Sequence, residues 1–456
     1  MLAPQLRQLT VGVIVSVAIM AFDGLGVTTA LPRIASELDG LATYGWAISA
    51  LMLASVVGTV IGGFIADRRG PRRPFVAGFV VFVAGLAQSA SAPSWELFLL
   101  GRTVQGLGVG AIMSMAYVIV AIAYPRRLQA RALALLSGAW TVPALIGPLA
   151  SSALTEAASW RFLFVGLIPL AVTVGALTLP GVPRLPSGES SGSGGLPRQL
   201  VFSIGLAVSA GLVLAGLEQR SLAALAVMVL IGGAAMIFAL RQVTPPGTLS
   251  ARRGVPAGIA TRAALSMAFF GIETFLPLAI TELRGASLLV AGLAVAAGAL
   301  VWVAGSMLQS RRELRQGIGT RRADSIFGLG ALGIGIGVIA VTLLGEVLPV
   351  WVAIIGWVIG GFGMGLAYNA TTAETFGQTE PEAIGQMSGT IQMAQTLGTA
   401  VIAGAGTALI AWAGDARGLA SAMTAIFALT GLLAIVTMPL ALRIRRPDRP
   451  AIGQVR

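Results

Sequence analysis

The stretch Gly62–Pro74 reads GGFIADRRGPRRP and lies between two long apolar runs. A short polar stretch in that position is expected to be a loop that joins two membrane spans. It holds four arginines, Arg68, Arg69, Arg72 and Arg73. Basic residues in short loops are retained on the cytoplasmic side during insertion, so this loop predicts the orientation of every other span by alternation.

Composition places the chain among polytopic helical membrane proteins. Of its 456 residues, 56% are apolar and only 11% are charged, and the mean hydropathy is +0.88. Soluble domains carry about 25% charged residues, so this class is excluded. The first apolar run, Val11–Ala30, is long enough to cross a bilayer and follows Arg7. We therefore expect it to be a span and not a cleaved signal peptide.

The residues that the chain lacks restrict its chemistry. Cys and His are absent, and all 30 basic residues are Arg. A disulfide, a zinc site and a His-based catalytic triad are thereby excluded, and no Gly-rich loop is followed by Lys. We expect no enzyme activity, no metal and no cofactor. Any proton that moves within the membrane must be carried by the side chain of Asp, Glu or Tyr. The net charge of +12 lies in loops between spans, which does not favour nucleic acid as a partner.

Hydropathy predicts fourteen spans and therefore both termini on the cytoplasmic side. The runs are 11–31, 44–66, 74–92, 97–121, 131–154, 161–180, 200–217, 221–240, 262–281, 286–309, 324–344, 348–370, 385–412 and 418–442. The pair 200–217 and 221–240 is short. A re-entrant hairpin there would leave twelve spans with the same orientation, so the charge rule does not separate the two topologies.

This topology divides the chain into six segments. They are an N-terminal six-helix bundle (1–180), a flexible cytoplasmic linker (181–199), an inserted helix pair (200–240), a second cytoplasmic linker (241–261), a C-terminal six-helix bundle (262–442) and a basic cytoplasmic tail (443–456). Most arginines then fall on the cytoplasmic side, and Arg262, the first residue of its span, is counted among them. The exception is the loop 373–385, which carries acids and no Arg.

The opening loop carries a motif. Gly63, Asp67, Arg68, Gly70, Arg72 and Arg73 form G-x(4)-D-R-x-G-R-R, which resembles the loop between the second and third spans of the major facilitator superfamily. Pro71 departs from that pattern. The resemblance implies the major-facilitator fold, with two six-helix bundles that rock about a central site, and a role for these six residues in conformational gating. A second basic cluster, between Gln309 and Asp324, echoes the loop in the second half.

Three charged residues lie inside apolar runs, where each costs about 2.5–3.5 kcal/mol on insertion scales. They are Asp23, Arg102 and Glu273. Arg102 begins the pattern R-x-x-Q-G-x-G, which resembles the facilitator motif that places an Arg in the proton pathway. We expect these three residues to couple protons, because burial favours the neutral form of Asp23 and the approach of Arg102 favours the ionised form. Structural pairing, or an Arg102 side chain that reaches the membrane surface, remain alternatives.

The fifth run contains GAWTVPALIGPLASS. Its residues Gly138, Pro143, Gly147 and Pro148 resemble the antiporter motif of exporters, although Ser151 and Ser152 replace the usual glycine pair. Trp140, Trp302 and Glu273 are weaker candidates for the wall of a substrate cavity, since tryptophan more often lies at membrane interfaces or in packing positions.

Together these motifs resemble the fourteen-span drug:proton antiporters. The resemblance implies a proton-coupled exporter of amphipathic, often cationic small molecules, in the inner cell membrane. Multidrug efflux, antibiotic resistance, contact with membrane lipid and a monomeric state are further expectations. A lipid or glycolipid exporter of the same fold is one alternative. A non-transporting receptor or scaffold is another, and such a protein has no need for charges inside the membrane.

Overall fold

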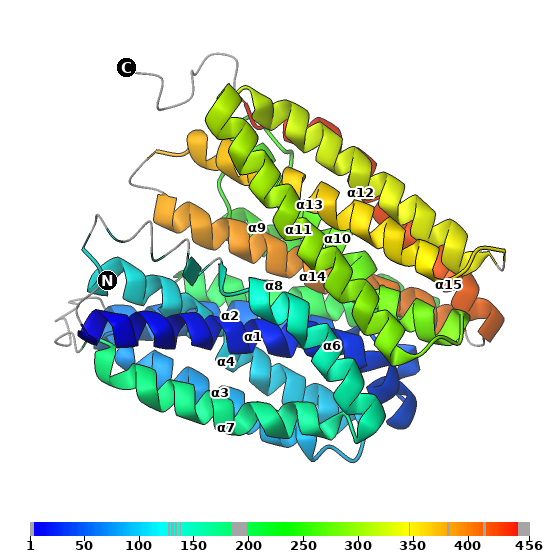
Figure 1. Cartoon of the computed structure of the whole chain (residues 1–456), viewed down its shortest axis with the longest axis horizontal. Helices are drawn as coiled ribbons and strands as arrows, with labels where there is room; N and C mark the ends of the chain where they lie inside the picture. Colours follow the sequence, from blue (N-terminus) through cyan, green and yellow to red (C-terminus); the bar gives the residue numbers. More distant parts are fainter. Residues whose placement is uncertain are drawn as a thin grey trace. The chain divides into compact units, whose positions relative to one another are not determined.

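The computed structural model describes residues 4–125, 128, 132, 135, 136, 138–183, 198–345, 347–380, 384–413 and 416–445. Within these ranges the chain is helical and contains no strand (Figure 1). Thirteen of the described helices are long and apolar enough to cross a membrane. The predicted linker 181–199 and tail 443–456 lie largely outside the described residues.

The chain forms two compact units, Met1–Leu212 and Val213–Arg456, and the division falls within α8. In the first unit α4 packs against both α2 and α3, while α1 packs against α6 and α7. The helices are α1 (Pro4–Glu37), α2 (Trp46–Arg69), α3 (Arg72–Ala90), α4 (Trp95–Ala123), α6 (Thr141–Ala157) and α7 (Arg161–Thr178), with short 3₁₀ turns at Leu41–Thr43 and Leu179–Gly181.

The second unit repeats this arrangement. Here α13 packs against both α11 and α12, while α10 packs against α14 and α15. Its helices are α10 (Val255–Leu278), the π-helical turn η3 (Ala279–Leu283), α11 (Leu288–Gln316), α12 (Thr320–Leu344), α13 (Trp351–Gly377), α14 (Ile384–Ala413) and α15 (Ala416–Leu442). The chain between the two sets of six helices forms α8 (Arg198–Leu217) and α9 (Leu222–Val243).

Glycines explain why the corresponding helices lie so close. The motif GLGVG (106–110) in α4 corresponds to GFGMG (361–365) in α13. In each motif a β-carbon on the outer glycines would overlap a backbone carbonyl of α2 or α11, and one on the middle glycine would overlap the backbone of α3 or α12. Only glycine permits backbones to approach this closely. The ends of α2 and α11 match as well, at Gly70 and Gly317, whose φ angles of 75° and 83° favour glycine.

The helices agree with the predicted spans, with two differences. The fifth run corresponds to α6, which has only 17 residues, and several residues before it are outside the described ranges. The second difference is α10, which begins at Val255 and not at residue 262, with Pro256 in its first turn, where proline is tolerated. The two short runs agree with the prediction of two further spans, because both form helices long enough to cross a membrane, α8 and α9.

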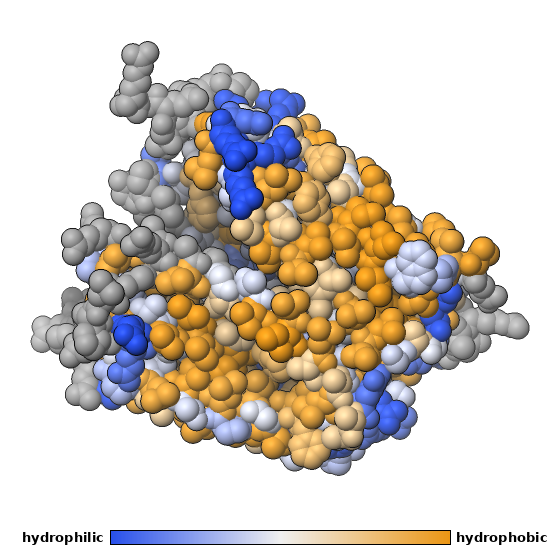
Figure 2. All heavy atoms as spheres, in the orientation of Figure 1, coloured by the Kyte–Doolittle hydropathy of each residue, from blue (hydrophilic) through white to orange (hydrophobic). Residues whose placement is uncertain are grey.

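Burial differs greatly between helices. In the most apolar stretch of α10, 83% of the residues are buried, whereas in that of α9 only 11% are. The face shown in Figure 2 is apolar along the middle of the helices, and hydrophilic residues gather where α11 ends and α12 begins. An apolar surface of this kind is expected for helices that face lipid.

Candidate functional site

Asp23 of α1 and Arg102 of α4 form a buried ion pair. Their side chains are 1% and 0% exposed. Arg102 Nη1 donates to both carboxylate oxygens of Asp23, at 3.0 and 3.1 Å, and to Gln105 Oε1 at 2.5 Å, while Nε donates to the Ala47 carbonyl at 3.3 Å. Two charges predicted inside separate spans are thus brought together across 79 residues. The alternative in which Arg102 reaches the surface is wrong, because the side chain is enclosed.

The ion pair of Asp23 and Arg102 lies near the place where the backbones of α4 and α2 come close. Arg102 lies about two turns into α4, just before the glycine motif that sets α4 against α2. Two donors of this cluster, Arg102 Nη2 and Gln105 Nε2, are buried and have no acceptor among the described residues. A buried polar group without a partner costs about 1–3 kcal/mol, so the cluster is not a fully satisfied structural network.

Glu273 lies in the second unit, in the last quarter of α10. It is 8% exposed. None of the ion pairs in the described part of the chain includes it. Four residues later Pro277 precedes a π-helical turn, in which the Thr281 hydroxyl donates to the Pro277 carbonyl at 3.0 Å. The regular α-helical hydrogen bonding therefore changes to a π-helical turn directly after Pro277.

Aromatic side chains lie next to Glu273 on the same helix. Trp302 of α11 packs on Phe269 and Phe270, with ring centroids 5.0 and 6.1 Å apart. Trp302 therefore packs on the helix that carries Glu273, about one turn before that residue. Trp140 belongs to the first unit, immediately before α6, and is 42% exposed.

The predicted antiporter motif falls on α6 and the residues before it. Pro143, Gly147 and Pro148 are buried, and Pro148 lies inside the helix. A β-carbon on Gly147 would meet Phe22 of α1 at 3.6 Å, an ordinary contact, whereas Gly138 has nothing within 4 Å. This segment therefore packs against α1 at Gly147, which lies beside the residue that precedes Asp23, whereas Gly138 makes no such close approach among the described residues.

The loop between α2 and α3 contains no network of ion pairs among its described residues. Asp67 is exposed, and no ion pair with it is present among the described residues. Arg68 instead stacks on Phe64, with Cζ 4.0 Å from the ring centroid. Gly63 has open space beside it, and Arg72 and Arg73 begin α3. The gating role of these residues stays a prediction.

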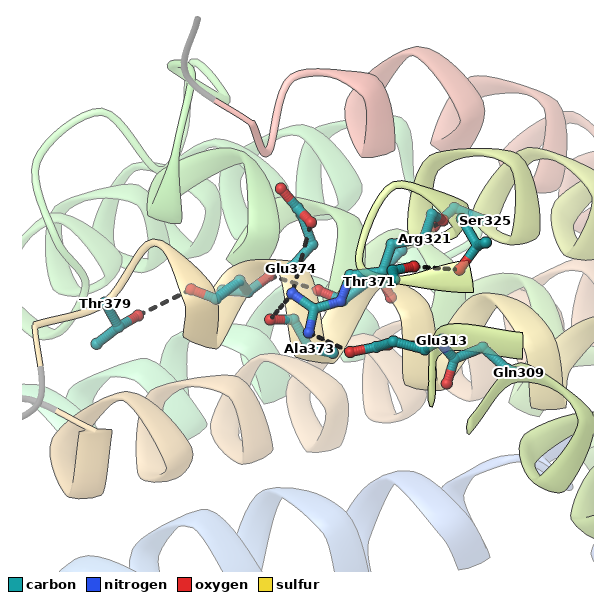
Figure 3. A network of polar contacts seen from close by, with 11 residues as sticks. Gln309, Glu313, Arg321, Ser325, Thr371, Ala373, Glu374 and Thr379 are labelled. Carbon is teal, nitrogen blue, oxygen red and sulfur yellow. Dashed lines mark hydrogen bonds and ion pairs between the residues drawn. The ribbon is translucent and has the colours of Figure 1, made fainter. Parts of the chain in front are cut away.

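The corresponding end of the second unit does contain such a network. Figure 3 shows Arg321 at its centre, between Glu313 of α11 and Glu374 of α13. Arg321 pairs with Glu313, its Nη1 lies 3.7 Å from Glu374, and the same nitrogen donates to the Ala373 carbonyl at 3.1 Å. A second pair joins Arg312 and Asp324 at 3.3 Å. These contacts tie together the ends of α11, α12 and α13.

One functional candidate was missed by sequence reasoning. Arg262, counted there as a cytoplasmic charge, is 3% exposed and lies inside α10. The cause is the early start of α10, which adds seven residues before the predicted span. Apolar residues follow Arg262, so a predicted span that began two helical turns earlier would have shown this arginine inside the span. Tyr368 of α13, which contacts Arg262, carried no signal in the sequence.

Comparison with known proteins identifies relatives. The chain is 30% identical to the "Uncharacterized transporter YebQ" of Escherichia coli (strain K12) over 251 residues, which cover 53% of this chain and 54% of that protein. It spans about half the length of this relative and about a third of several others. It is 26% identical to the "Probable multidrug-efflux transporter MT1670" of Mycobacterium tuberculosis (strain CDC 1551 / Oshkosh), over 92% of this chain and 91% of that one.

A solved structure and a family model also match this chain. A solved D-xylose-proton symporter superposes with a TM-score of 0.67 at 16% identity, over 97% of this chain and 98% of that one, which shows the fold alone. The family model of the Major Facilitator Superfamily matches residues 13–344, well over half of the chain. This chain therefore belongs to the Major Facilitator Superfamily.

Proposed function

We propose that this chain is a proton-coupled exporter of amphipathic, often cationic small molecules, located in the cell membrane with both termini in the cytoplasm. The observation that carries the proposal is the buried pair of Asp23 and Arg102. A carboxylate enclosed with a guanidinium is favoured in its ionised form, and the same carboxylate is favoured in its neutral form once the guanidinium moves away. A helix movement that opens and closes the pair can therefore release and bind a proton.

Two further facts support export. Several relatives are named as multidrug transporters, among them the Mycobacterium tuberculosis protein and "Multidrug resistance protein 3" of Bacillus subtilis (strain 168). In addition, Pro143 and Pro148 lie in α6, the helix whose sequence resembles the antiporter motif. A coupling group inside the membrane has no use in a receptor or scaffold, which argues against that alternative.

The test is flux in proteoliposomes that contain the purified chain and an imposed pH difference. Wild type should accumulate a fluorescent cationic dye against its gradient, and Asp23→Asn should bind the dye but not accumulate it. Glu37→Gln is the matched control, because this acid lies at the end of the same helix and its ion pair with Arg161 is exposed. Uphill transport by Asp23→Asn would show that another group carries the proton. Transport of labelled lipid in place of the dye would favour the lipid exporter.

A further inference from the structure

Arg262 is a buried cation without a counter-ion in the part of the chain that the structure describes. The residue is 3% exposed, and the ion pairs among the described residues do not include it. Its Nη1 is buried and has no hydrogen-bond acceptor there. Arg102 is equally buried but has Asp23 as its partner. An unpaired charge inside a membrane protein is expensive, so its retention calls for a functional explanation.

The guanidinium of Arg262 is held in a defined orientation. Its Cζ lies 3.6 Å from the ring centroid of Tyr368. Its Nη2 donates to the hydroxyl of Thr372, which in turn donates to the Tyr368 carbonyl. A guanidinium that stacks on a ring keeps the N–H groups along its edges for acceptors in its own plane. Thr372 takes one edge, and Nη1 remains for a further acceptor.

Arg262 shares one face of α10 with Glu273. Arg262, Ser266, Phe269 and Glu273 follow the spacing i, i+4, i+7 and i+11, which places them in one stripe along the helix. Eleven residues correspond to about 16 Å along the axis. The Ser266 hydroxyl is also buried without a partner among the described residues. The stripe therefore carries a cation at one end, an acid at the other, and an unused polar group near the cation.

Aromatic rings line the stripe between its charged ends. Trp302 packs on Phe269 and also on Tyr368, whose ring centroid is 5.3 Å away. Both Trp302 and Tyr368 are half-buried, in contrast to Phe269, which is fully buried. The Tyr368 hydroxyl donates to Gln395 of α14 at 3.1 Å, which anchors the ring that stacks on Arg262. An apolar or aromatic molecule with an anionic group fits this order of contacts.

We propose that Arg262 binds a carboxylate on the transported compound, and that the preferred substrates are amphipathic molecules with a carboxylate at one end and an aromatic body that lies along Trp302 and Tyr368. The inference rests on the proposed export function and names its substrate class. A planar carboxylate is the ligand that a guanidinium edge binds best, with two parallel hydrogen bonds when both nitrogens are available. Zwitterions, whose cationic end lies toward Glu273, are the most complete match.

The test measures binding and does not need a proton gradient. The protein is placed in nanodiscs of phosphatidylcholine, and two probes are compared by fluorescence anisotropy: a rhodamine dye with a free carboxylate and the ethyl ester of the same dye. The dissociation constant of wild type should be at least about tenfold lower for the acid than for the ester, as expected for one charge-assisted hydrogen bond. Arg262→Gln should abolish that preference without weakening the ester. Arg252→Gln, an exposed arginine ten residues earlier, should keep it.

Stability separates this role from a structural one. Removal of an unpaired buried charge should leave the unfolding temperature unchanged or higher. A purely structural Arg262 would instead give a lower unfolding temperature and equally weakened binding of both probes, which would overturn the inference. Should the Gln variant not fold, Arg262→Lys keeps the charge but lacks the planar fork, and it should show a smaller preference for the acid. An unchanged preference in the Lys variant would contradict carboxylate recognition by the fork.

Two further outcomes are distinguishable. Displacement of the acid probe by added phosphatidylglycerol would mean that the site takes a lipid phosphate, and the assignment to a transported carboxylate would then be wrong. Failure of export itself appears in the dye-flux assay under an imposed pH difference, where the ester serves as substrate. Loss of flux together with an intact Arg262-dependent preference would therefore overturn the proposed function and leave the binding site standing.

Discussion

Trp357 occupies the place in α13 that Arg102 occupies in α4. Each lies four residues before the first glycine of its motif, and each is 0% exposed. Arg102 pairs with Asp23, whereas the Trp357 ring stacks on Phe269 of α10, with centroids 4.6 Å apart and 22° between the planes. The same close approach of helix backbones thus occurs within each unit, but the side chain beside it is a charged arginine in the first unit and a tryptophan in the second. We expect the coupling charge to be carried by the first unit.

The first prediction concerns the stability of the ion pair. Arg102→Gln should destabilise the folded protein by about 3–5 kcal/mol, since it leaves the Asp23 carboxylate buried without its partner. The double variant Asp23→Asn/Arg102→Gln should regain most of that loss, because both charges are gone. The measurement is denaturant unfolding of the purified protein in detergent, arranged as a double-mutant cycle. Additive losses would mean that the two residues do not interact in solution.

The second prediction concerns Asp67 in the loop between α2 and α3. Asp67→Asn should leave expression and thermal stability unchanged, because the carboxylate is exposed and has no ion pair among the described residues. If the motif controls gating as its resemblance implies, the same variant should slow turnover, because the cytoplasmic side of the transporter would close less tightly. Turnover is read from initial dye flux, and Asp39→Asn, in a loop of the same unit, is the control. Wild-type flux in Asp67→Asn would remove this residue from the gate.

Much of this fold could be predicted because the bilayer imposes it. About 30 Å of hydrocarbon requires about 20 apolar residues for each helix, and the charge of loops orients them. Asp23, Arg102 and Glu273 were identifiable for the same reason, since each interrupts an apolar run at a cost. The contact between Asp23 and Arg102 required the resemblance as well, because nothing in a single sequence pairs residues 79 apart.

The remainder depends on helix ends and on packing between distant helices. Residues before 262 include Arg252, Arg253, Gly254 and Pro256, which are typical of a loop, yet α10 begins at Val255. Arg262 was therefore counted as a cytoplasmic charge at the first residue of the span, although the structure encloses it against Tyr368, more than a hundred residues later. The network around Arg321 was visible only as a basic cluster, because Glu374 comes from α13 and lies about fifty residues later in the sequence.

The third prediction concerns the close approach of α13 and α11. Gly361→Ala should cost about 1–3 kcal/mol of stability, because its methyl group would overlap the Gly298 carbonyl and neither backbone can move freely. Gly337→Ala in α12 is the control, since nothing lies within 4 Å of that position. Thermal unfolding of both variants in the same detergent gives the comparison. An equal unfolding temperature for the two would mean that α11 and α13 are farther apart in solution than in this structure.

The last prediction concerns Glu273 and the range of compounds transported. Glu273 lies one helical turn after Phe269 in α10, is 8% exposed and has no ion pair among the described residues. A cationic group on a substrate would supply the charge that this acid lacks, and the attraction would be strong because the surroundings are apolar. Glu273→Gln keeps the shape of the side chain and removes the charge. Flux of cationic dyes should therefore fall about tenfold or more, whereas a neutral dye of similar size should be exported at the wild-type rate. Glu282→Gln, an acid in the π-helical turn of the same unit, is the control for general effects on expression. Parallel loss of cationic and neutral substrates would assign Glu273 to proton coupling, and full retention of both would remove it from the site.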